Sequence, residues 1–399
     1  MKKVELLAPA KDLIKAKTAI RYGADAVYIG GKSFSLRSRA SNFGLKEIDE
    51  IVKFAHSYGK KIYVTSNIVF HDEDFYGYVE YLESLEAIGV DAIIVESYAA
   101  VQLARKYAPS IECHLSTQIN SLNSEAIKCY ARWGVKRVVL AREVDIDNMA
   151  LIAKKTILPL EVFIHGGMCS NYSGRCTLSN RMTLRDANRG GCAQSCRWKY
   201  ELYDGDYLIS DEVTKLSMSS KDLCALEHIE KMVRMGVDSL KIEGRMKSDY
   251  YIAQVVKTYR KMIDEIYDHS LSDERLEYYR NEFAKAENRP VASGFLDGKC
   301  DADKHLYGVN GAGVTHEFVG YVLGYQDGFA KVEVRNHFAI GNQLEVFGPH
   351  IDNERFEVVE SYDEEGNFQE VMNKPMSVVY IRIPFVVERH DMIRKAIDR

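Results

Sequence analysis

Residues 4–30 read VELLAPAKDLIKAKTAIRYGADAVYIG, and this stretch holds one complete repeat of the pattern that decides the fold. A short apolar run at 4–7 is followed by an amphipathic stretch at 13–22, and a second apolar run occupies 26–29. Gly23 separates the helical stretch from the second run, because glycine accepts the left-handed conformation that often ends a helix. This order of strand, helix and strand predicts a parallel βαβ unit.

The same pattern recurs through the first two thirds of the chain. Eight strands are expected, at 4–7, 26–29, 61–66, 92–95, 112–115, 137–140, 161–164 and 239–242. Amphipathic helical stretches lie between most of them, and several end in glycine. Eight such units predict an α/β fold, namely a TIM-like (β/α)8 barrel. A doubly wound open sheet has the same periodicity and is the alternative.

The spacing changes at two places, which divide the chain into parts. A cysteine-rich insertion at about 166–220 separates the seventh and eighth strands, where long loops of a barrel build active sites. Residues 288–313 contain Pro290 and five glycines and predict a linker. Short alternating strands follow and predict a small all-β barrel or sandwich. We therefore expect a (β/α)8-like catalytic domain over 1–287 and a small β-barrel domain over 314–399.

The composition excludes several classes of protein. The 399 residues carry 53 Lys and Arg against 58 Asp and Glu, a net charge of −5, so any contact with nucleic acid must use a local basic patch. No run of about 18 apolar residues occurs, so we expect no membrane partner. No secretory signal pattern is visible, and we expect a cytoplasmic location. Cysteines stay reduced there, so the eight present should be ligands, catalysts or core residues.

Four cysteines of the insertion follow the spacing C-x6-C-x15-C-x3-C, at Cys169, Cys176, Cys192 and Cys196. Thiolates bind soft metals and iron–sulfur clusters, and the many nearby glycines let backbone amides approach sulfur. A structural zinc site is one alternative, although zinc ribbons usually place two residues between paired cysteines. The others are a nucleophilic thiol such as Cys169 paired with His165, and unrelated core cysteines.

The insertion is basic within an acidic chain. Residues 166–200 contain one acid, Asp186, and six basic residues, a net charge of +5 before thiolates are counted. The basic residues are Arg175, Arg181, Arg185, Arg189, Arg197 and Lys199. Part of this charge can offset a negative metal centre, and the remainder predicts a patch that binds phosphate or carboxylate. Ordinary surface charge is the alternative.

Polar residues also mark most of the expected barrel strands. The carboxyl ends of parallel barrel strands meet at one mouth, so these side chains could form a site there, although each alone could be a satisfied core residue. They are Glu5, Asn67, Glu96, His114, Ser116, Gln118, Arg142, His165, Lys241, Glu243 and Arg245. Near the second strand, Gly30-Gly31-Lys32 with Arg37 and Arg39 could bind an anion, and a solvated loop is the alternative.

Eight stretches together resemble one known family. They are ELLAPA at 5–10, YGADAVYIGG at 22–31, LRSRASNF at 36–43, HLSTQ at 114–118, HGGMCSNYSGRC at 165–176, GGCAQSCRWKY at 190–200, SSKDL at 219–223 and KIEGRMKS at 241–248. The sequence resembles the U32 collagenase-like peptidase family over nearly its whole length, and most closely the tRNA-hydroxylating branch. Lys11 stands where this family usually has glycine after ELLxPA.

This resemblance implies an activity and a cofactor. It implies that Cys169, Cys176, Cys192 and Cys196 hold a 4Fe–4S cluster. It also implies prephenate-dependent hydroxylation of the wobble uridine of tRNA, which gives 5-hydroxyuridine; related members hydroxylate a ribosomal RNA cytidine. The expected partners are tRNA and, as a second candidate, a paralogous family member. The alternative is a collagenase-like peptidase, but the chain contains neither H-E-x-x-H nor G-x-S-x-G.

Within this interpretation we assign roles to named residues. We predict catalytic roles for His114, Gln118, His165 and Glu243. We predict that substrate is bound by arginines, namely Arg37, Arg39, Arg142, Arg175, Arg197 and Arg245. Prephenate carries two carboxylates, and Arg142 and Arg245 are the pair expected to hold them.

Overall fold

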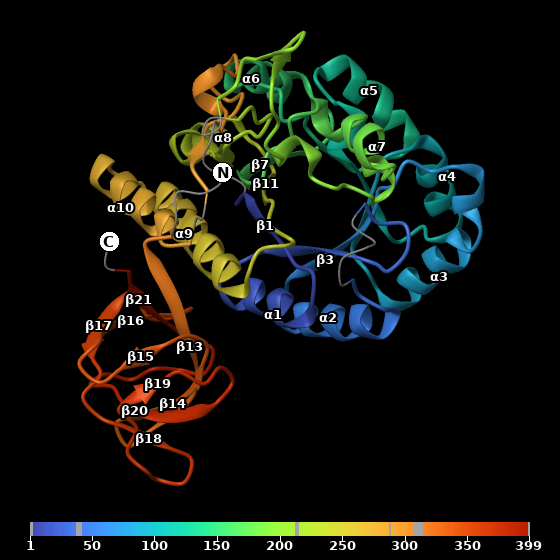
Figure 1. Ribbon diagram of the computed structural model, residues 1–399. Coiled ribbons are helices and arrows are strands. Elements are labelled where there is room, and N and C mark those ends of the chain that lie inside the picture. The colour runs from blue at the N-terminus through green and yellow to red at the C-terminus, as the bar shows by residue number, and fades with distance from the viewer. Residues whose placement is uncertain (1–2, 37–41, 212–214, 287–288, 307–313, 398–399) are drawn as a thin grey trace.

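Eight parallel strands form a closed barrel in the computed structural model, which describes residues 3–36, 42–211, 215–286, 289–306 and 314–397 (Figure 1). Consecutive strands pair with each other, and β11 pairs with both β7 and β1, which closes the ring. The strands are β1 (Glu5–Pro9), β2 (Ala26–Gly30), β3 (Lys61–Ser66), β4 (Ala92–Val95), β5 (Glu112–Leu115), β6 (Arg137–Val139), β7 (Leu160–Gly166) and β11 (Ser239–Ile242). The TIM-like barrel is therefore confirmed, and the open sheet is excluded.

Helices between the strands form an outer ring around the barrel (Figure 1). They are α1 (Leu13–Arg21), α2 (Leu45–Ser57), α3 (Tyr78–Ile88), α4 (Tyr98–Tyr107), α5 (Ser124–Trp133), α6 (Ile146–Lys155), α8 (Ile229–Met235) and α9 (Asp249–Tyr267). Side chains such as those of Asp12 and Ser248 cap the first turns by accepting backbone N–H bonds. Gly134 ends α5 with a φ of +94°, which glycine tolerates without strain. None of the described helices could cross a membrane.

Charged side chains fill the amino end of the barrel interior. Arg137 Nη1 lies 3.2 Å from Glu161 Oε2 and also pairs with Glu5, while Lys241 Nζ lies 2.7 Å from Glu161 Oε1. Glu161 is fully buried, so these cations compensate a charge that burial alone would make costly. The grouping of Glu5 with the carboxyl-end residues was wrong, because Glu5 is the first residue of β1 and lies at the amino end.

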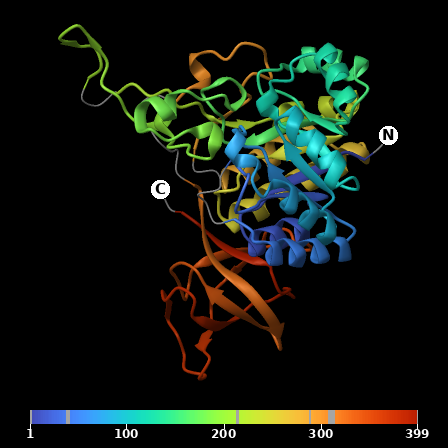
Figure 2. The same ribbon diagram turned by 90° about the vertical axis from the view of Figure 1, so that its right-hand side faces the viewer.

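The insertion leaves the barrel after β7. It contains the 3-10 turns η3 (Tyr172–Gly174), η4 (Ala187–Arg189) and η5 (Ser195–Arg197), the short helix α7 (Leu178–Thr183) and the hairpin β8 (Tyr203–Asp204) and β9 (Tyr207–Leu208). Beyond the hairpin, β10 (Asp222–Cys224) pairs antiparallel with β7, and β12 (Val291–Ala292) pairs with β10. Figure 2 shows the insertion on one end of the barrel, with the hairpin pointing away from it.

The C-terminal part is a seven-stranded antiparallel sheet. In spatial order it comprises β17 (Glu354–Glu357), β16 (Gln343–Phe347), β21 (Met392–Ala396), β13 (His316–Gln326), β14 (Phe329–Val334), β20 (Val378–Arg382) and β18 (Ser361–Asp363). A separate pair is formed by β15 (Phe338–Ala339) and β19 (Val371–Met372). The sheet curls around its own apolar core as a half-barrel, since its two edge strands do not pair within the described residues.

A buried arginine joins this sheet to the barrel domain. Arg394 of β21 is fully buried, and its guanidinium bonds to Glu345 Oε1 at 2.7 Å and to Gln254 Oε1 at 2.7 Å. It also lies 3.3 Å from Glu282 Oε2 on α10 (Asp273–Ala284). Gln254 lies on α9, so a single side chain connects the sheet with both helices that follow the barrel.

Loss of this arginine should strongly destabilise the protein. In Arg394→Met the buried carboxylates of Glu282 and Glu345 lose their central partner, and we expect the free energy of unfolding to fall by about 3–5 kcal/mol in denaturant titrations. Arg382→Met removes an exposed pair with Glu360 from the same sheet and should cost less than about 1 kcal/mol. Equal losses in the two variants would contradict this account.

The same cluster should make stability sensitive to acid. Burial alone would raise the pKa of the Glu345 carboxyl, but Arg394 and Lys285 lower it to about 2, below the ordinary 4.5. A lowered folded-state pKa means that this stabilisation is complete above pH 4.5 and is lost as the pH falls toward 2. Unfolding free energies measured across this window should fall less steeply for Glu345→Gln than for the wild type. Parallel curves would argue against the pKa assignment.

Candidate functional site

Buried amides and hydroxyls line the carboxyl end of the barrel on the side of β3 and β5. Asn67, which follows β3, donates from Nδ2 to Gln118 Oε1 at 2.7 Å, and Ser116 donates to the same oxygen at 3.1 Å. All three residues are buried. The amide of Gln118, one of the predicted catalytic residues, is thus held in one orientation at the barrel mouth.

A second group of polar residues lies on β2 and in the segments that follow β2 and β11. Tyr28 donates its hydroxyl proton to Glu243 Oε2 at 2.9 Å. Arg245 is buried, and its Nη1 lies 3.2 Å from both Ser35 Oγ and Thr65 Oγ1. Gly30 leaves room for this guanidinium, since a Cβ at position 30 would lie only 2.6 Å from Arg245 Nη1.

Arg142 lies beside this group, on an aromatic ring. Its Cζ is 4.0 Å from the centroid of Phe163 on β7, and Lys241 Nζ lies 5.2 Å from the same ring. Such stacking holds a guanidinium in place without consuming its hydrogen-bond donors. Arg142 is half-buried and forms no ion pair with another described residue, so it can receive an anion.

The two predicted catalytic histidines lie elsewhere. His114 is buried inside the barrel, where its Nε2 is 3.0 Å from Glu112 Oε2, and burial lowers its pKa so that the ring is neutral near pH 7. His165 Nδ1 is 3.1 Å from Tyr259 Oη, and the ring packs against Phe283 of α10. The structure thus groups Gln118 and Glu243 with the mouth and places His165 in the packing against α9 and α10.

The insertion contributes Arg175 to the mouth. Arg175 donates from Nε to the backbone oxygen of Gln118 at 3.1 Å. Burial raises the pKa of nearby Glu96, and the charge of Arg175 opposes that shift. Arg197 lies close to Gly167, at the start of the insertion. Two further predicted arginines, Arg37 and Arg39, lie outside the described residues.

The chain leaves the barrel through a tight crossing at Gly166. This residue has a φ of +99°, and a Cβ there would lie 1.9 Å from the backbone oxygen of Glu243. Only glycine therefore fits where the insertion leaves the barrel. The absence of a side chain lets the start of the insertion lie against the segment after β11, which contains Glu243 and Arg245.

The four motif cysteines differ in their surroundings. Cys176 is buried, and its Sγ accepts bonds from Asn171 Nδ2 at 3.3 Å and from the backbone N–H of Ser179 at 3.5 Å. Cys169 and Cys196 are half-buried, and Cys192 is exposed. The thiols and the donors directed at sulfur fit the chemistry of an iron–sulfur or zinc ligand set. Within the described residues, however, no three His, Cys, Asp or Glu side chains converge closely enough to hold a metal ion.

Cys169 also lines a cavity of about 230 Å³ between the insertion and the segment that follows β12. The cavity includes Met168, Lys221, Phe295 and Cys300. The sequence gives no sign that Cys300 lies near Cys169, because more than a hundred residues without a shared motif separate them. Neither Tyr28 nor Phe163 was singled out either, since each reads as an ordinary apolar strand residue.

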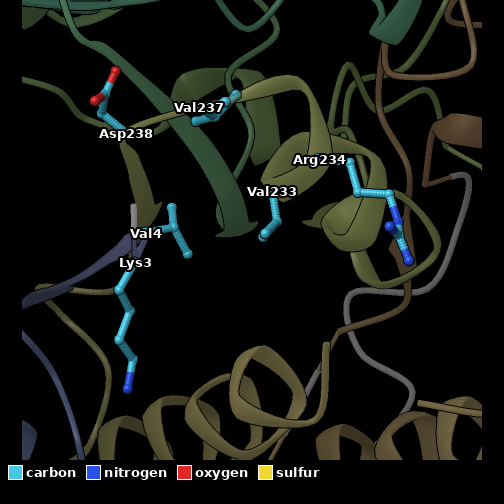
Figure 3. Close-up of a pocket in the computed structure, with 7 residues that line it drawn as sticks. Lys3, Val4, Val233, Arg234, Val237 and Asp238 are labelled. Atoms are coloured by element: carbon cyan, nitrogen blue, oxygen red, sulfur yellow. The ribbon is translucent and has the colours of Figure 1, made fainter. Parts of the chain in front are cut away.

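A second cavity lies at the amino end of the barrel and is not part of this site. Figure 3 shows it between the start of β1 and the turn before β11, lined by Lys3, Val4, Val233, Arg234, Val237 and Asp238. Its volume is about 140 Å³. None of the predicted site residues lines it. Its Asp238 accepts a hydrogen bond at Oδ2 from the backbone N–H of Leu160, which is a contact within the fold.

Two family models match this chain, and known proteins are similar to it over most of its length. Residues 11–306 match the model of peptidase family U32, and residues 314–394 match that of the peptidase family U32 C-terminal domain. The tRNA hydroxylation protein P1 of Bacillus subtilis is 43% identical over 401 residues, which cover 99% of this chain and 95% of that protein. The match to the 23S rRNA 5-hydroxycytidine C2501 synthase of Escherichia coli is 38% identical and covers 86% of this chain and 52% of that protein.

A relative named for a different activity is also similar to most of this chain. The collagenase of Porphyromonas gingivalis is 32% identical over 362 residues, which cover 86% of each chain. Family membership and activity are therefore separate questions, because similar identity extends to proteins named for RNA hydroxylation and for proteolysis. The family itself is settled by the matched regions and by these relatives: the chain belongs to peptidase family U32.

Proposed function

We propose that this protein hydroxylates the wobble uridine of tRNA to 5-hydroxyuridine. The observation that carries the proposal is the 43% identity, over 99% of the chain, to a protein named for tRNA hydroxylation. The arrangement at the barrel mouth supports it, because the basic insertion lies at the end of the barrel where Asn67 and Gln118 are buried, and its Arg175 contacts the backbone of Gln118. Net hydroxylation replaces the hydrogen on C5 of the base with a hydroxyl group. The base loses two electrons, so a two-electron oxidant and a source of the oxygen atom must enter the reaction from outside the protein.

The residues at the mouth suit an unstacked nucleotide. Arg175 and Arg197 of the insertion supply positive charge for the phosphates of an anticodon loop, whose bases are already accessible. Gln118, oriented by Asn67 and Ser116, can read the edge of a base through hydrogen bonds. Glu243, held by Tyr28, provides a carboxylate that can accept or position a proton there.

We extend the proposal to a 4Fe–4S cluster bound by Cys169, Cys176, Cys192 and Cys196. A cluster held there would supply electron transfer beside the base. Asn171 and the Ser179 amide direct N–H groups at Cys176 Sγ, as protein donors commonly do at cluster sulfurs. Because the described positions of the thiols do not form a ligand shell, cluster binding requires the insertion to draw the four sulfurs together.

Prephenate is the co-substrate in this proposal. It carries two carboxylates, and arginine forks bind carboxylates well. Arg142, stacked on Phe163, has donors available for one of them. Arg245 already bonds to Ser35 and Thr65, so it is fixed in place and can orient the second.

The peptidase alternative has less support at this site. The collagenase relative is the observation that favours it. Peptide hydrolysis needs an activated nucleophile or water beside a general base. The two histidines that could serve are engaged with Glu112 and Tyr259.

Nucleoside analysis of tRNA tests the proposed reaction. In a strain that lacks this gene and any redundant hydroxylase, 5-hydroxyuridine and its derivatives should disappear, and the wild-type gene should restore them. A complemented strain that cannot make prephenate should also lack them. Persistence of the nucleoside in the knockout would refute the hydroxylase function, and its presence without prephenate would refute only the co-substrate.

Substitution of a motif cysteine tests the cofactor. Anaerobically purified wild-type protein should be brown and contain iron and sulfide, whereas Cys176→Ser should lose both and at least about 100-fold in hydroxylation, because ligand loss exceeds the effect of outer partners. Cys129→Ser is the matched control, since Cys129 is an exposed thiol on α5 outside the insertion. Colourless protein with bound zinc would favour a structural metal site. Gelatin cleavage that survives Cys176→Ser would support the peptidase.

A further inference from the structure

The insertion spans the barrel mouth from one side to the other. It leaves the barrel from β7, and the closed strand order places β3 directly opposite, four strands away in either direction. The backbone N–H of Val69, which follows β3, donates to the backbone oxygen of Asn188 at 3.0 Å. In Figure 1, helix α7 accordingly lies inside the ring of outer helices.

Arg189 makes the main side-chain contact at the far side. Its Nη2 lies 2.8 and 2.9 Å from the two carboxylate oxygens of Asp74 and 3.0 Å from Glu73 Oε1, and its Nη1 lies 3.1 Å from His71 Nδ1. Asp74 is itself fixed, because its Oδ2 accepts the backbone N–H of His71 at 2.8 Å. The Asp74 side chain is only 17% exposed, so this charge-assisted contact is better shielded than an ordinary surface pair.

Asn188 connects the same point to a motif cysteine. Its Oδ1 accepts the backbone N–H of Cys176 at 3.0 Å, and its Nδ2 donates to the backbone oxygen of Cys176 at 2.9 Å. One side chain therefore satisfies both backbone groups of Cys176. On the other side of Arg189, Gly191 closes a tight turn in which a Cβ would lie 2.7 Å from the Asp186 backbone oxygen. Cys192 follows that turn directly.

We infer that Asn188 and Arg189 form a latch that positions the cysteine-bearing insertion across the barrel mouth. Arg189 fixes the middle of the insertion to the segment after β3, and Asn188 holds the backbone of Cys176 to the same point. Both are positioning residues, because each acts through Cys176 or the insertion rather than on a substrate. The latch itself follows from these contacts, and only its effect on RNA modification rests on the proposed function.

Hydrogen exchange of the full-length protein, measured by mass spectrometry, tests the latch. In Arg189→Ala and Asp74→Ala, amide exchange over residues 171–192 should rise about tenfold, while exchange of the barrel strands stays unchanged. The loss of protection in the double variant should be smaller than the sum of the two single losses, because both single variants remove the same contact between Arg189 and Asp74. Arg181→Ala is the matched control: Arg181 is an exposed arginine of the same insertion that forms no ion pair with another described residue, and its loss should leave exchange at the wild-type level.

Two further variants separate positioning from general destabilisation. Arg189→Lys keeps the charge but loses the two-pronged contact, so it should restore part of the protection. The charge-swapped double variant, Arg189→Asp with Asp74→Arg, should show more protection from amide hydrogen exchange than either of its single substitutions. In Asn188→Ala the peptide containing Cys176 should lose protection, because its amide donates to the removed side chain. Wild-type exchange in Arg189→Ala and Asn188→Ala would overturn the inference.

Measurements of activity and iron content then test whether the latch contributes to tRNA hydroxylation. If the proposed function holds, Arg189→Ala should lower both the 5-hydroxyuridine formed and the iron retained, and Arg189→Lys should partly recover both. If wild-type protein forms no 5-hydroxyuridine while the exchange results appear as expected, the latch stands and the proposed function fails. If exchange changes but iron and product do not, the positioning role is refuted.

Discussion

Pairing of β11 with β7 is the interaction on which the site depends. It converts a row of parallel strands into a ring, so the carboxyl ends of all eight strands face one mouth. Without closure, β3 and β7 would be separated along an open sheet, and an insertion after β7 could not reach the segment after β3. Gln118, Arg142 and Glu243 lie at the same end of the barrel because the strands that they follow belong to this ring.

The general architecture could be predicted because it follows from local patterns. Alternating apolar runs and amphipathic stretches, separated by residues such as Gly23 and Gly134, indicate βα units whatever their final arrangement. The direction of single side chains was harder to predict. The register of β11 against β7 shifts between Lys241 and Ile242, where His165 pairs, and such an irregularity changes which face a side chain occupies. His165 packs against Tyr259, although its place near the carboxyl end of the strand predicted a position at the mouth.

The motif cysteines were visible in the sequence, but the residues that hold them were not. Cysteine spacing has recognisable chemistry, whereas Asn188 and Asp74 look like ordinary polar loop residues. Asp74 matters because it contacts Arg189, more than a hundred residues away in the chain, and Asn188 matters because its side chain bonds to the backbone of Cys176. The same limit applies to Arg394: a basic residue in a short strand gives no sign that it will be fully buried against two carboxylates from other elements.

The crossing at Gly166 has an implication for how members of this fold can diverge. Gly166 joins β7 to the insertion and lies against the backbone of Glu243, in the same segment as Arg245. Any side chain there would collide with the backbone of Glu243, so a substitution at this junction would disturb the mouth. Evolutionary or engineered changes to the insertion should instead accumulate in the solvent-exposed hairpin of β8 and β9, which adjoins neither strand end.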